Sequence, residues 1–503
     1  MNYFQQRKLS RRRFIGEASC AAVGSSSLFS TIMNLRMASS AAAQSLPSGP
    51  SLSAQNLNEA DDYKALVCIF LAGGNDSFNM LVPRDSSEYG EYATIRSDLA
   101  LPSGDLLPLS GTTADGRSFG LHPAMPELAQ LYNSGDAAFV ANVGTLVEPT
   151  TKSGIESGMA KLPLGLYSHL DQIMHWQTSV PDKRTGFGWG GRTADLLQSL
   201  NENDVISMNI SLSGINLFQT GETLTEYSVA PWGNGAIQVI GHDDDGWARH
   251  VWQNAAIESL LDLEYQNLFD QTFAQKTRSS IASANQFASA IGALTPFATD
   301  FSDNEVSFNL QMVAKTIAAR KSLGYRRQTF FILFGGWDHH DEVLNNQMEM
   351  LSYVSKGMKE FYDALGEIGM QSNVTTFTAS DFGRTLVSNG QGSDHAWGGN
   401  HIVMGGDVNG GNLYGEYPSL YADNPLDTGH GRLIPTTSCD EYFAEMALWF
   451  GVDRSELPTV FPNIDRFYDP NSGGMPLGFL SNQDGQNQPQ PDLTETIYMP
   501  MIQ

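Results

Sequence analysis

The chain has 503 residues and a formal net charge of −26, from 55 acidic and 29 basic residues. Such a charge repels nucleic acids and anionic membrane surfaces, so we expect neither as a partner. The three cysteines are too few for a disulfide framework or a cysteine-rich metal site. The length suits one large α/β domain with insertions, or two domains.

The first 43 residues are predicted to be an export signal. Arg11, Arg12 and Phe14 resemble the twin-arginine consensus, and a mildly apolar run over residues 18–33 leads to three alanines that end at Ala43. A basic tail without fixed structure is the alternative. We therefore expect transport by the twin-arginine translocase, cleavage after Ala43, and a periplasmic or secreted protein. No later apolar run reaches the roughly 20 residues of a membrane span, so no stable membrane anchor is expected.

The rest of the chain is expected to form one large body. Residues 44–62 are rich in Ser, Gly, Pro and Asn and predict a flexible linker, residues 63–480 an α/β domain, and residues 481–503 a polar tail. Five apolar or β-rich runs predict buried strands, at residues 65–71, 137–143, 329–334, 374–378 and 401–404.

Helices are expected between most of these strands. Apolar residues three and four positions apart predict helices at residues 126–134, 166–176, 190–200, 247–275, 305–322, 341–367 and 439–450. This alternation indicates the α/β class, with a mostly parallel central sheet and helices on both faces. Residues 201–298 interrupt the alternation and are expected to form a largely helical insertion.

Acidic residues and histidines follow three of the predicted strands. Asp76 follows the first strand, Asp338 and His340 follow the third, and Asp381 follows the fourth. Ligands gather at the carboxyl ends of the strands in an open α/β sheet, where carboxylates and imidazoles from separate loops can hold a divalent ion. The alternative for any one Asp is a turn or helix-cap residue, and Asp341 is a candidate cap for the helix that follows it.

A second cluster precedes the fifth strand and contains Asp394, His395 and His401. Together with His339 and His340 it holds four of the ten histidines of the chain. If these residues served only as turn or cap residues after the strands, so many acids and histidines would not be needed. The clusters together therefore favour a metal site. The ion expected is Zn, Mn, Mg or Ca.

Ser168 is the candidate nucleophile. It is expected to begin a helix, where amide N–H groups and the helix dipole stabilise an anionic ester on its hydroxyl, although an ordinary Ser N-cap is the alternative. His169 beside it is interpreted as either a group that supports the site or a surface residue. Arg384 and Arg192 could each bind a phosphate or sulfate with two N–H groups, or form a structural salt bridge.

Several sequence blocks resemble a large exported bacterial family, the domain of unknown function numbered 1501. The resemblance covers most of residues 65–465, and the blocks that carry it lie at residues 70–83, 121–123, 380–385, 389–390, 392–398, 405–408 and 435–437. That family is placed with the alkaline phosphatase and sulfatase superfamily, whose members cleave or transfer phosphate and sulfate esters with one or two divalent ions.

The resemblance implies roles for particular residues. It implies metal ligation by Asp76, the pair Asp338 and His340, Asp381 and His395, and it places Ser168 where the superfamily has its nucleophile. Two departures matter. Phe382 stands where the superfamily often has a histidine, which leaves a second ion short of a ligand unless Asp394 or His401 supplies it. Tyr167 stands where family members commonly have Arg.

These features predict an exported, metal-dependent hydrolase of a phosphate or sulfate ester. Ser168 and Arg384 are its expected catalytic residues, and Asp76, Asp338, His340, Asp381, Asp394, His395 and His401 its expected metal residues. The alternative is a non-catalytic exported binding or scaffold protein that keeps a degenerate site. A redox protein is the third option, but no haem-attachment, iron–sulfur or dinucleotide-binding motif is found in the sequence.

Overall fold

The structure is a computed structural model that describes residues 62–111, 113, 116–203, 205–238 and 248–481. The expected export signal, all of the expected linker except Asp62, and all of the tail except Ser481 lie outside the described residues. The chain divides into two compact units. The larger comprises Ala54–Ile237 and Ser283–Gln503, and the smaller comprises Met1–Ser53 and Gln238–Ala282.

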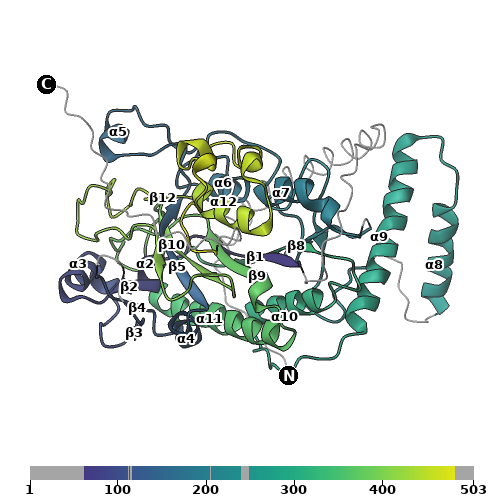
Figure 1. The fold of residues 1–503 in the computed structure, drawn as a ribbon, viewed down its shortest axis with the longest axis horizontal. Helices are drawn as coiled ribbons and strands as arrows, with labels where there is room; N and C mark the ends of the chain where they lie inside the picture. The colour runs from purple at the N-terminus through teal and green to yellow at the C-terminus, as the bar shows by residue number, and fades with distance from the viewer. Residues whose placement is uncertain (1–61, 112, 114–115, 204, 239–247, 482–503) are drawn as a thin grey trace, which may run out of the picture. The chain divides into compact units, whose positions relative to one another are not determined.

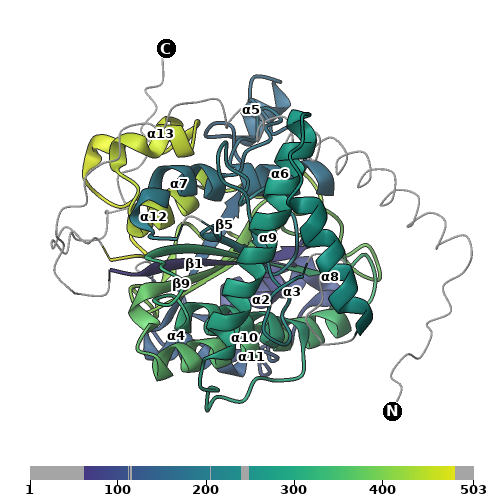
Figure 2. The ribbon, with the colours of Figure 1, turned by 90° about the vertical axis from the view of Figure 1, so that its right-hand side faces the viewer.

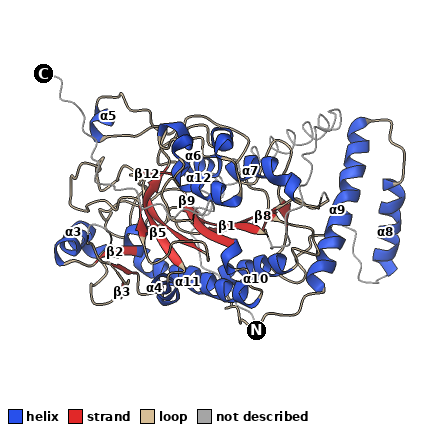
Figure 3. Ribbon diagram, in the orientation of Figure 1, coloured by secondary structure: helices blue, strands red, loops and turns tan. Residues whose placement is uncertain are grey.

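A nine-stranded sheet forms the centre of the larger unit, in the order β11-β5-β10-β9-β1-β8-β6-β7, with β12 paired to β5 (Figure 3). Its strands are β1 (Lys64–Ala72), β5 (Ala137–Gly144), β6 (Asn209–Ser211), β7 (Tyr227–Ser228), β8 (Arg327–Gly335), β9 (Val374–Ser380), β10 (Gly399–Met404), β11 (Leu413–Tyr414) and β12 (Thr437–Ser438). The apolar strand β1 lies in the middle and is buried on both faces, as a strand between two helical layers must be.

Most pairings in this sheet are parallel, including those of β1 with β8 and with β9. Strand β10 is the exception, because it runs antiparallel to both β5 and β9. The expected α/β class with a mainly parallel central sheet is therefore confirmed. The reversed direction of β10 places its first residue, Gly399, at the edge of the sheet where β9 ends.

Helices cover both faces of the sheet (Figures 1 and 2). One face carries α4 (Pro126–Ser134), α10 (Glu305–Ala318) and α11 (Val343–Glu367). The other carries α6 (His169–Thr178), α7 (Trp189–Leu197), α12 (Cys439–Phe450) and α13 (Leu457–Val460). Among the described residues, none of the helices has both the length and the apolar character that crossing a bilayer requires.

Short elements outside these layers were not expected. A small antiparallel sheet has the order β2-β4-β3 and is formed by β2 (Leu81–Pro83), β3 (Leu107–Pro108) and β4 (Phe119–Leu121). The short helices are α2 (Ser77–Met80), α3 (Ser86–Arg96) and α5 (Lys152–Glu156). Each of these strands has at most three residues, which is too short for a period-two pattern to stand out.

The single helix expected over residues 247–275 is wrong. The described part of this region contains two helices, α8 (Ala248–Leu261) and α9 (Leu268–Gly292). The side chain of Asn267 accepts a hydrogen bond of 2.8 Å from the amide of Phe269, so it starts a new helix. Within the smaller unit, Leu261 packs with Ala274 and Ile281.

Candidate metal centre

The strand-end residues do gather at one edge of the sheet. Ala72 of β1 pairs with Gly335 of β8, and Leu71 pairs with Ser380 of β9, so the three strands end level with one another. Asp338 and Asp381 follow β8 and β9 directly. His395 precedes β10 and reaches the same edge because that strand runs in the opposite direction.

Gly73 allows the loops after β1 and β8 to touch. Its φ of 122° lies in a region that other residues rarely adopt, and a Cβ atom there would lie 2.4 Å from the amide nitrogen of Asp338. The amide of Gly73 donates a 3.0 Å hydrogen bond to Asp381 Oδ1. A single glycine therefore sets the distance between the loops that carry Asp338 and Asp381.

Three imidazoles converge on one carboxylate oxygen. Asp338 Oδ1 lies 3.0 Å from His340 Nε2, 3.2 Å from His395 Nε2 and 3.6 Å from His169 Nε2. The Nε2 atoms of His340 and His395 are themselves 3.0 Å apart. His169, Asp338 and His395 form a group whose ligand atoms all lie within 4.8 Å of one another. We call His169, Asp338, His340 and His395 the histidine cluster.

Each imidazole is also held from behind, through its Nδ1 atom. His169 Nδ1 donates to Asp381 Oδ2 over 2.7 Å, and His340 Nδ1 donates to Asp394 Oδ1 over 3.0 Å. His395 Nδ1 donates to the backbone carbonyl of Tyr167 over 2.8 Å. All three partners present an acceptor oxygen, so each Nδ1 carries a proton and each ring turns its Nε2 toward Asp338.

This arrangement fits a divalent ion. Ligand atoms about 2.0–2.1 Å from one tetrahedral ion lie roughly 3.3 Å apart. The Nε2 atoms of the three histidines lie 3.0, 3.2 and 3.6 Å from Asp338 Oδ1, close to that spacing. Histidines that bind a metal almost always donate their second ring N–H to a carboxylate or backbone carbonyl, as these three do. In addition, His169 Nε2 is buried without a hydrogen-bond partner. Imidazole nitrogen with one carboxylate oxygen suits Zn²⁺ better than the oxygen-seeking Ca²⁺ or Mg²⁺.

An ion-pair cluster without metal is the other arrangement these groups can make. Burial disfavours a charged imidazole at His169, but the facing carboxylates of Asp338 and Asp381 outweigh it and raise its pKa to about 9. Burial also opposes ionisation of Asp338, yet hydrogen bonds from His169 and His395 and the charge of Arg384 hold its pKa below the usual value. A proton on His169 and a metal ion therefore compete for the same lone pair.

Arg384 lies at the back of the cluster with its side chain fully buried. Its Nη1 donates to Asp338 Oδ1 over 2.9 Å, while its Nε and Nη2 atoms are buried without a partner. Burial lowers the pKa of this guanidinium, and the charge of Asp338 opposes that shift. Arg384 therefore fixes Asp338 and keeps two N–H-bearing nitrogen atoms uncommitted beside the site.

The structure sorts the seven expected metal residues into three groups. Asp338, His340 and His395 face one another, whereas Asp381 and Asp394 hold imidazoles from behind. Asp76 and His401 lie apart from the histidine cluster.

Asp76 is fully buried and forms an ion pair with Arg96, which is fully buried too. His401, on β10, packs its ring against Trp176 and Tyr442, and burial lowers its pKa to about 3. The structure therefore places both residues in the core of the fold.

His169 is the cluster residue that sequence reasoning left open. Ser168 occupies the N-cap position of α6, as expected, but its side chain makes no cap hydrogen bond; it contributes instead to lowering the pKa of Asp171. His169 is the first helical residue and points at Asp338. A histidine beside a helix-start serine was the available signal, and only the loop after β8 shows what that histidine faces.

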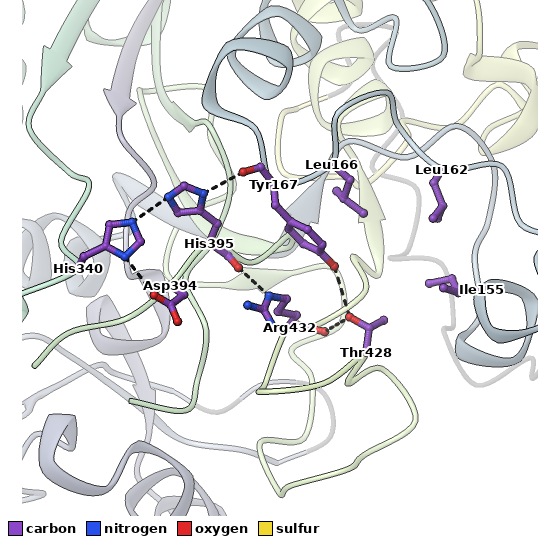
Figure 4. Close-up of a pocket in the computed structure, with 9 residues that line it drawn as sticks. All are labelled: Ile155, Leu162, Leu166, Tyr167, His340, Asp394, His395, Thr428 and Arg432. Atoms are coloured by element: carbon purple, nitrogen blue, oxygen red, sulfur yellow. Dashed lines mark hydrogen bonds and ion pairs between the residues drawn. The ribbon is translucent and has the colours of Figure 1, made fainter. Parts of the chain in front are cut away.

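A pocket of about 530 Å³ opens beside the cluster (Figure 4). Its lining residues are Ile155, Leu162, Leu166, Tyr167, His340, Asp394, His395, Thr428 and Arg432. In Figure 4, His340, His395 and Asp394 lie at one end and Ile155, Leu162 and Leu166 at the other. One end of the pocket is therefore polar and the other is apolar.

Comparison with known proteins gives one clear result. A family model described as "Protein of unknown function (DUF1501)" matches residues 63–430. The chain belongs to the DUF1501 family. The match includes His169, Asp338, Asp381 and His395, so the histidine cluster of this DUF1501 protein lies within the shared region. No curated protein matches its sequence.

Two solved structures share a weak likeness with the DUF1501 chain. They are described as "Crystal structure of Ps i-CgsB in complex with k-i-k-neocarrahexaose" and "Crystal structure of Ps i-CgsB", each at 11% identity and a TM-score of 0.30. The first covers 81% of this chain and 78% of that chain, and the second 80% and 77%. At this TM-score the likeness does not establish a common fold.

Proposed function

We propose that this protein is a metal-dependent hydrolase of a phosphate or sulfate ester. The observation that carries the proposal is the convergence of three Nδ1-anchored imidazoles on Asp338 Oδ1. Four residues from three separate loops are held so that their lone pairs meet, which is unfavourable unless a cation or a proton lies between them. A bound Zn²⁺ or Mn²⁺ would polarise the oxyanion of the ester and lower the pKa of a nearby hydroxyl.

We assign the nucleophilic attack and the proton transfer to two further side chains, Ser168 and Asp171. Ser168 lies one residue before His169 at the N-terminus of α6, where the helix dipole favours an anionic group. Its oxygen attacks phosphorus or sulfur, the bond to the alcohol oxygen breaks, and the serine proton passes by way of Asp171 to the departing alcohol oxygen. Water then displaces Ser168, so the net reaction consumes one water and releases an alcohol and phosphate or sulfate.

Phe382 favours a site with one ion. Its ring centroid lies 4.9 Å from that of His169 and 4.5 Å from that of His395, so a phenyl group occupies the space beside both imidazoles. Asp76 is committed to Arg96 and does not complete a second set of ligands. We therefore propose one ion per chain, within a fold of the alkaline phosphatase type.

The test combines metal content with turnover. Purified protein reconstituted with Zn²⁺ or Mn²⁺ should hold about one ion per chain by elemental analysis and should hydrolyse 4-nitrophenyl phosphate or sulfate. Asp338→Ala should lose both the ion and turnover, because the shared ligand is removed. Ser168→Ala should keep the ion and lose turnover by at least about a thousandfold.

The matched control is Asp341→Ala, an exposed acid in the same loop as Asp338. It precedes α11 and does not cap that helix, whose N-cap residue is Glu342, so metal content and turnover should be unchanged. Protein that binds no divalent ion after reconstitution would contradict the proposal. Turnover retained in Ser168→Ala would assign the attack to water.

A non-catalytic metal-binding protein is the second candidate. It is favoured by the surroundings of Asp171. Burial opposes ionisation of this carboxyl group, but its 2.9 Å ion pair with Arg184 lowers the pKa, which makes Asp171 a weak proton acceptor for Ser168. One ion per chain with no turnover of any phosphate or sulfate ester would support it.

The place of action we propose is outside the cytoplasm. The support is the twin-arginine pattern at Arg11 and Arg12 in the sequence. Exchanging both for Lys should retain the protein in the cytoplasm, as measured by cell fractionation.

A further inference from the structure

The pocket beside the histidine cluster changes character along its length. One end is formed by His340, Asp394 and His395, and the other by Ile155, Leu162 and Leu166 (Figure 4). A ligand that fills about 530 Å³ must meet both ends, and this volume suits a small molecule.

Tyr167 and Arg432 connect the two ends. The guanidinium of Arg432 lies 5.5 Å from the ring centroid of Tyr167, within the range of a cation–π contact. Arg432 Nε donates to the backbone carbonyl of His395 over 2.9 Å, and the carbonyl of Tyr167 accepts from His395 Nδ1. Hydrogen bonds therefore hold both Tyr167 and Arg432 to His395, a residue of the histidine cluster.

The backbone of Tyr167 is strained. Its φ is 72°, a left-handed conformation that is unfavourable for a bulky residue. The conformation lets Tyr167 turn its carbonyl to His395 and its ring into the pocket at the same time. Strain of this kind is found where the surrounding structure holds a residue for a ligand.

The apolar end is backed by core residues. Ile155, Leu166 and Tyr167 pack against a buried cluster of Leu146, Trp397 and Ile434. The indole of Trp397 donates to the carbonyl of Thr145 over 2.7 Å, which fixes that cluster. Leu162 is the exposed edge of the end, with 38% of its surface accessible. The apolar surface is therefore held in place before any ligand arrives.

We infer that the substrate joins a tetrahedral oxyanion to a compact apolar group of aromatic size. This inference rests on the proposed function and names its substrate class. The oxyanion lies at the histidine end, where Arg432 supplies positive charge. The apolar group packs on Ile155, Leu162 and Leu166, beside the ring of Tyr167.

The same geometry disfavours esters of sugars and other polyols. Their hydroxyl groups would be buried against Ile155, Leu162 and Leu166 without hydrogen-bond partners, and each unpaired group weakens binding. The apolar end thereby excludes polar alcohols as well as binding apolar ones.

The test measures binding of substrate mimics that cannot be hydrolysed. Phenylphosphonate and methylphosphonate share an oxyanion and differ in the apolar group, and benzenesulfonate and methanesulfonate form the sulfate-like pair. Calorimetry with the metal-loaded full chain should show the phenyl member of at least one pair binding at least about tenfold more tightly.

Two leucine variants locate the effect. Leu162→Asn should reduce the phenyl advantage to about threefold or less while the methyl compound binds as before. Leu164→Asn is the matched control, because Leu164 is 43% exposed on the same loop and does not line the pocket. It should leave the phenyl advantage unchanged.

The outcomes separate this inference from the proposed function. Equal affinity for the phenyl and methyl compounds, or a phenyl advantage that survives Leu162→Asn, overturns the inference and leaves metal-dependent hydrolysis in place. No binding of any of the four compounds by metal-loaded protein, together with no ester turnover, overturns both.

Discussion

Asp76 and Asp338 follow neighbouring parallel strands, and the sequence treats them alike. In the structure they have opposite surroundings. Asp76 is fully buried and neutralised by Arg96, whereas Asp338 has 45% of its side chain exposed and faces three imidazoles and Arg384. The position of a carboxylate at a strand end therefore does not by itself determine whether it binds a ligand. The partner that reaches it from elsewhere in the chain decides whether it supports the fold or forms the site.

Arg96 shows how the structural role is built. Besides Asp76, it donates to Asn79 Oδ1 over 3.0 Å and to the carbonyls of Thr385 and Leu386 over 2.8 and 3.2 Å. It thereby joins the loop after β1 to the loop after β9 through one buried cation. Asp76 balances that charge.

The largest effect that tests this comparison is on stability. Asp76→Ala should lower the free energy of unfolding by about 3–5 kcal/mol, because it leaves the buried Arg96 without its counter-charge. Chemical denaturation of the metal-free protein measures this. The same measurement on Asp394→Ala, which removes the carboxylate that holds His340, should show a change below about 1 kcal/mol, because the side chains of Asp394 and His340 are 46% and 45% exposed. Equal losses in the two variants would contradict the division of roles.

A smaller effect concerns the residues that hold the imidazoles. Asp381→Asn should weaken metal affinity by about 10–100-fold, because the amide no longer fixes the proton on His169 Nδ1. Competition with a chelating dye measures the affinity. Asp341→Asn serves as the control in the loop after β8, and an unchanged affinity in Asp381→Asn would show that His169 is not oriented by Asp381.

The smallest expected effect concerns Asp440, a buried acid whose protonation makes the stability depend on pH. Asp440 on α12 makes no ion pair with any described residue, and burial raises its pKa to about 7, although a hydrogen bond from Cys439 opposes the shift. Between about pH 4 and 7 the folded state keeps a proton that the unfolded state has released. Stability should therefore fall as pH rises through this window.

Asp440→Asn removes that contribution. The slope of unfolding free energy against pH should become less negative by about 1 kcal/mol per pH unit between pH 5 and 7. Denaturation curves at several pH values measure it. Identical slopes in the two proteins would show that Asp440 is ionised in the folded state.

Patterns within one segment were enough to predict much of the fold. All five expected strands are present, and the helices over residues 126–134 and 439–450 have the bounds that were expected. Continuous apolar runs and the three-and-four spacing are local properties, so they survive without tertiary information. The break at Asn267 was missed because an N-cap can interrupt a helical pattern without disturbing its apolar spacing.

The site was predictable only in part. The strand-end acids pointed to the edge of the sheet where the histidine cluster lies, because parallel strands end together. Which acid faces the histidines depends on Arg96, whose guanidinium reaches Asp76 from α3. The role of His169 depends on Asp338 and Asp381, far away in the chain. Contacts between segments far apart in the sequence cannot be predicted from a local sequence pattern.

The central position of β1 has a consequence for the order of assembly. This strand is among the first described residues to be synthesised, yet its neighbours in the sheet are β8 and β9. Lys64 can pair only after Arg327 has been made, and Ala65 only after Val374. Pairings between such distant segments form slowly. The loops that end these strands therefore come together only after most of the chain has left the ribosome. Binding of a metal ion at the histidine cluster would then report completed folding, the state in which the proposed twin-arginine route would carry the protein.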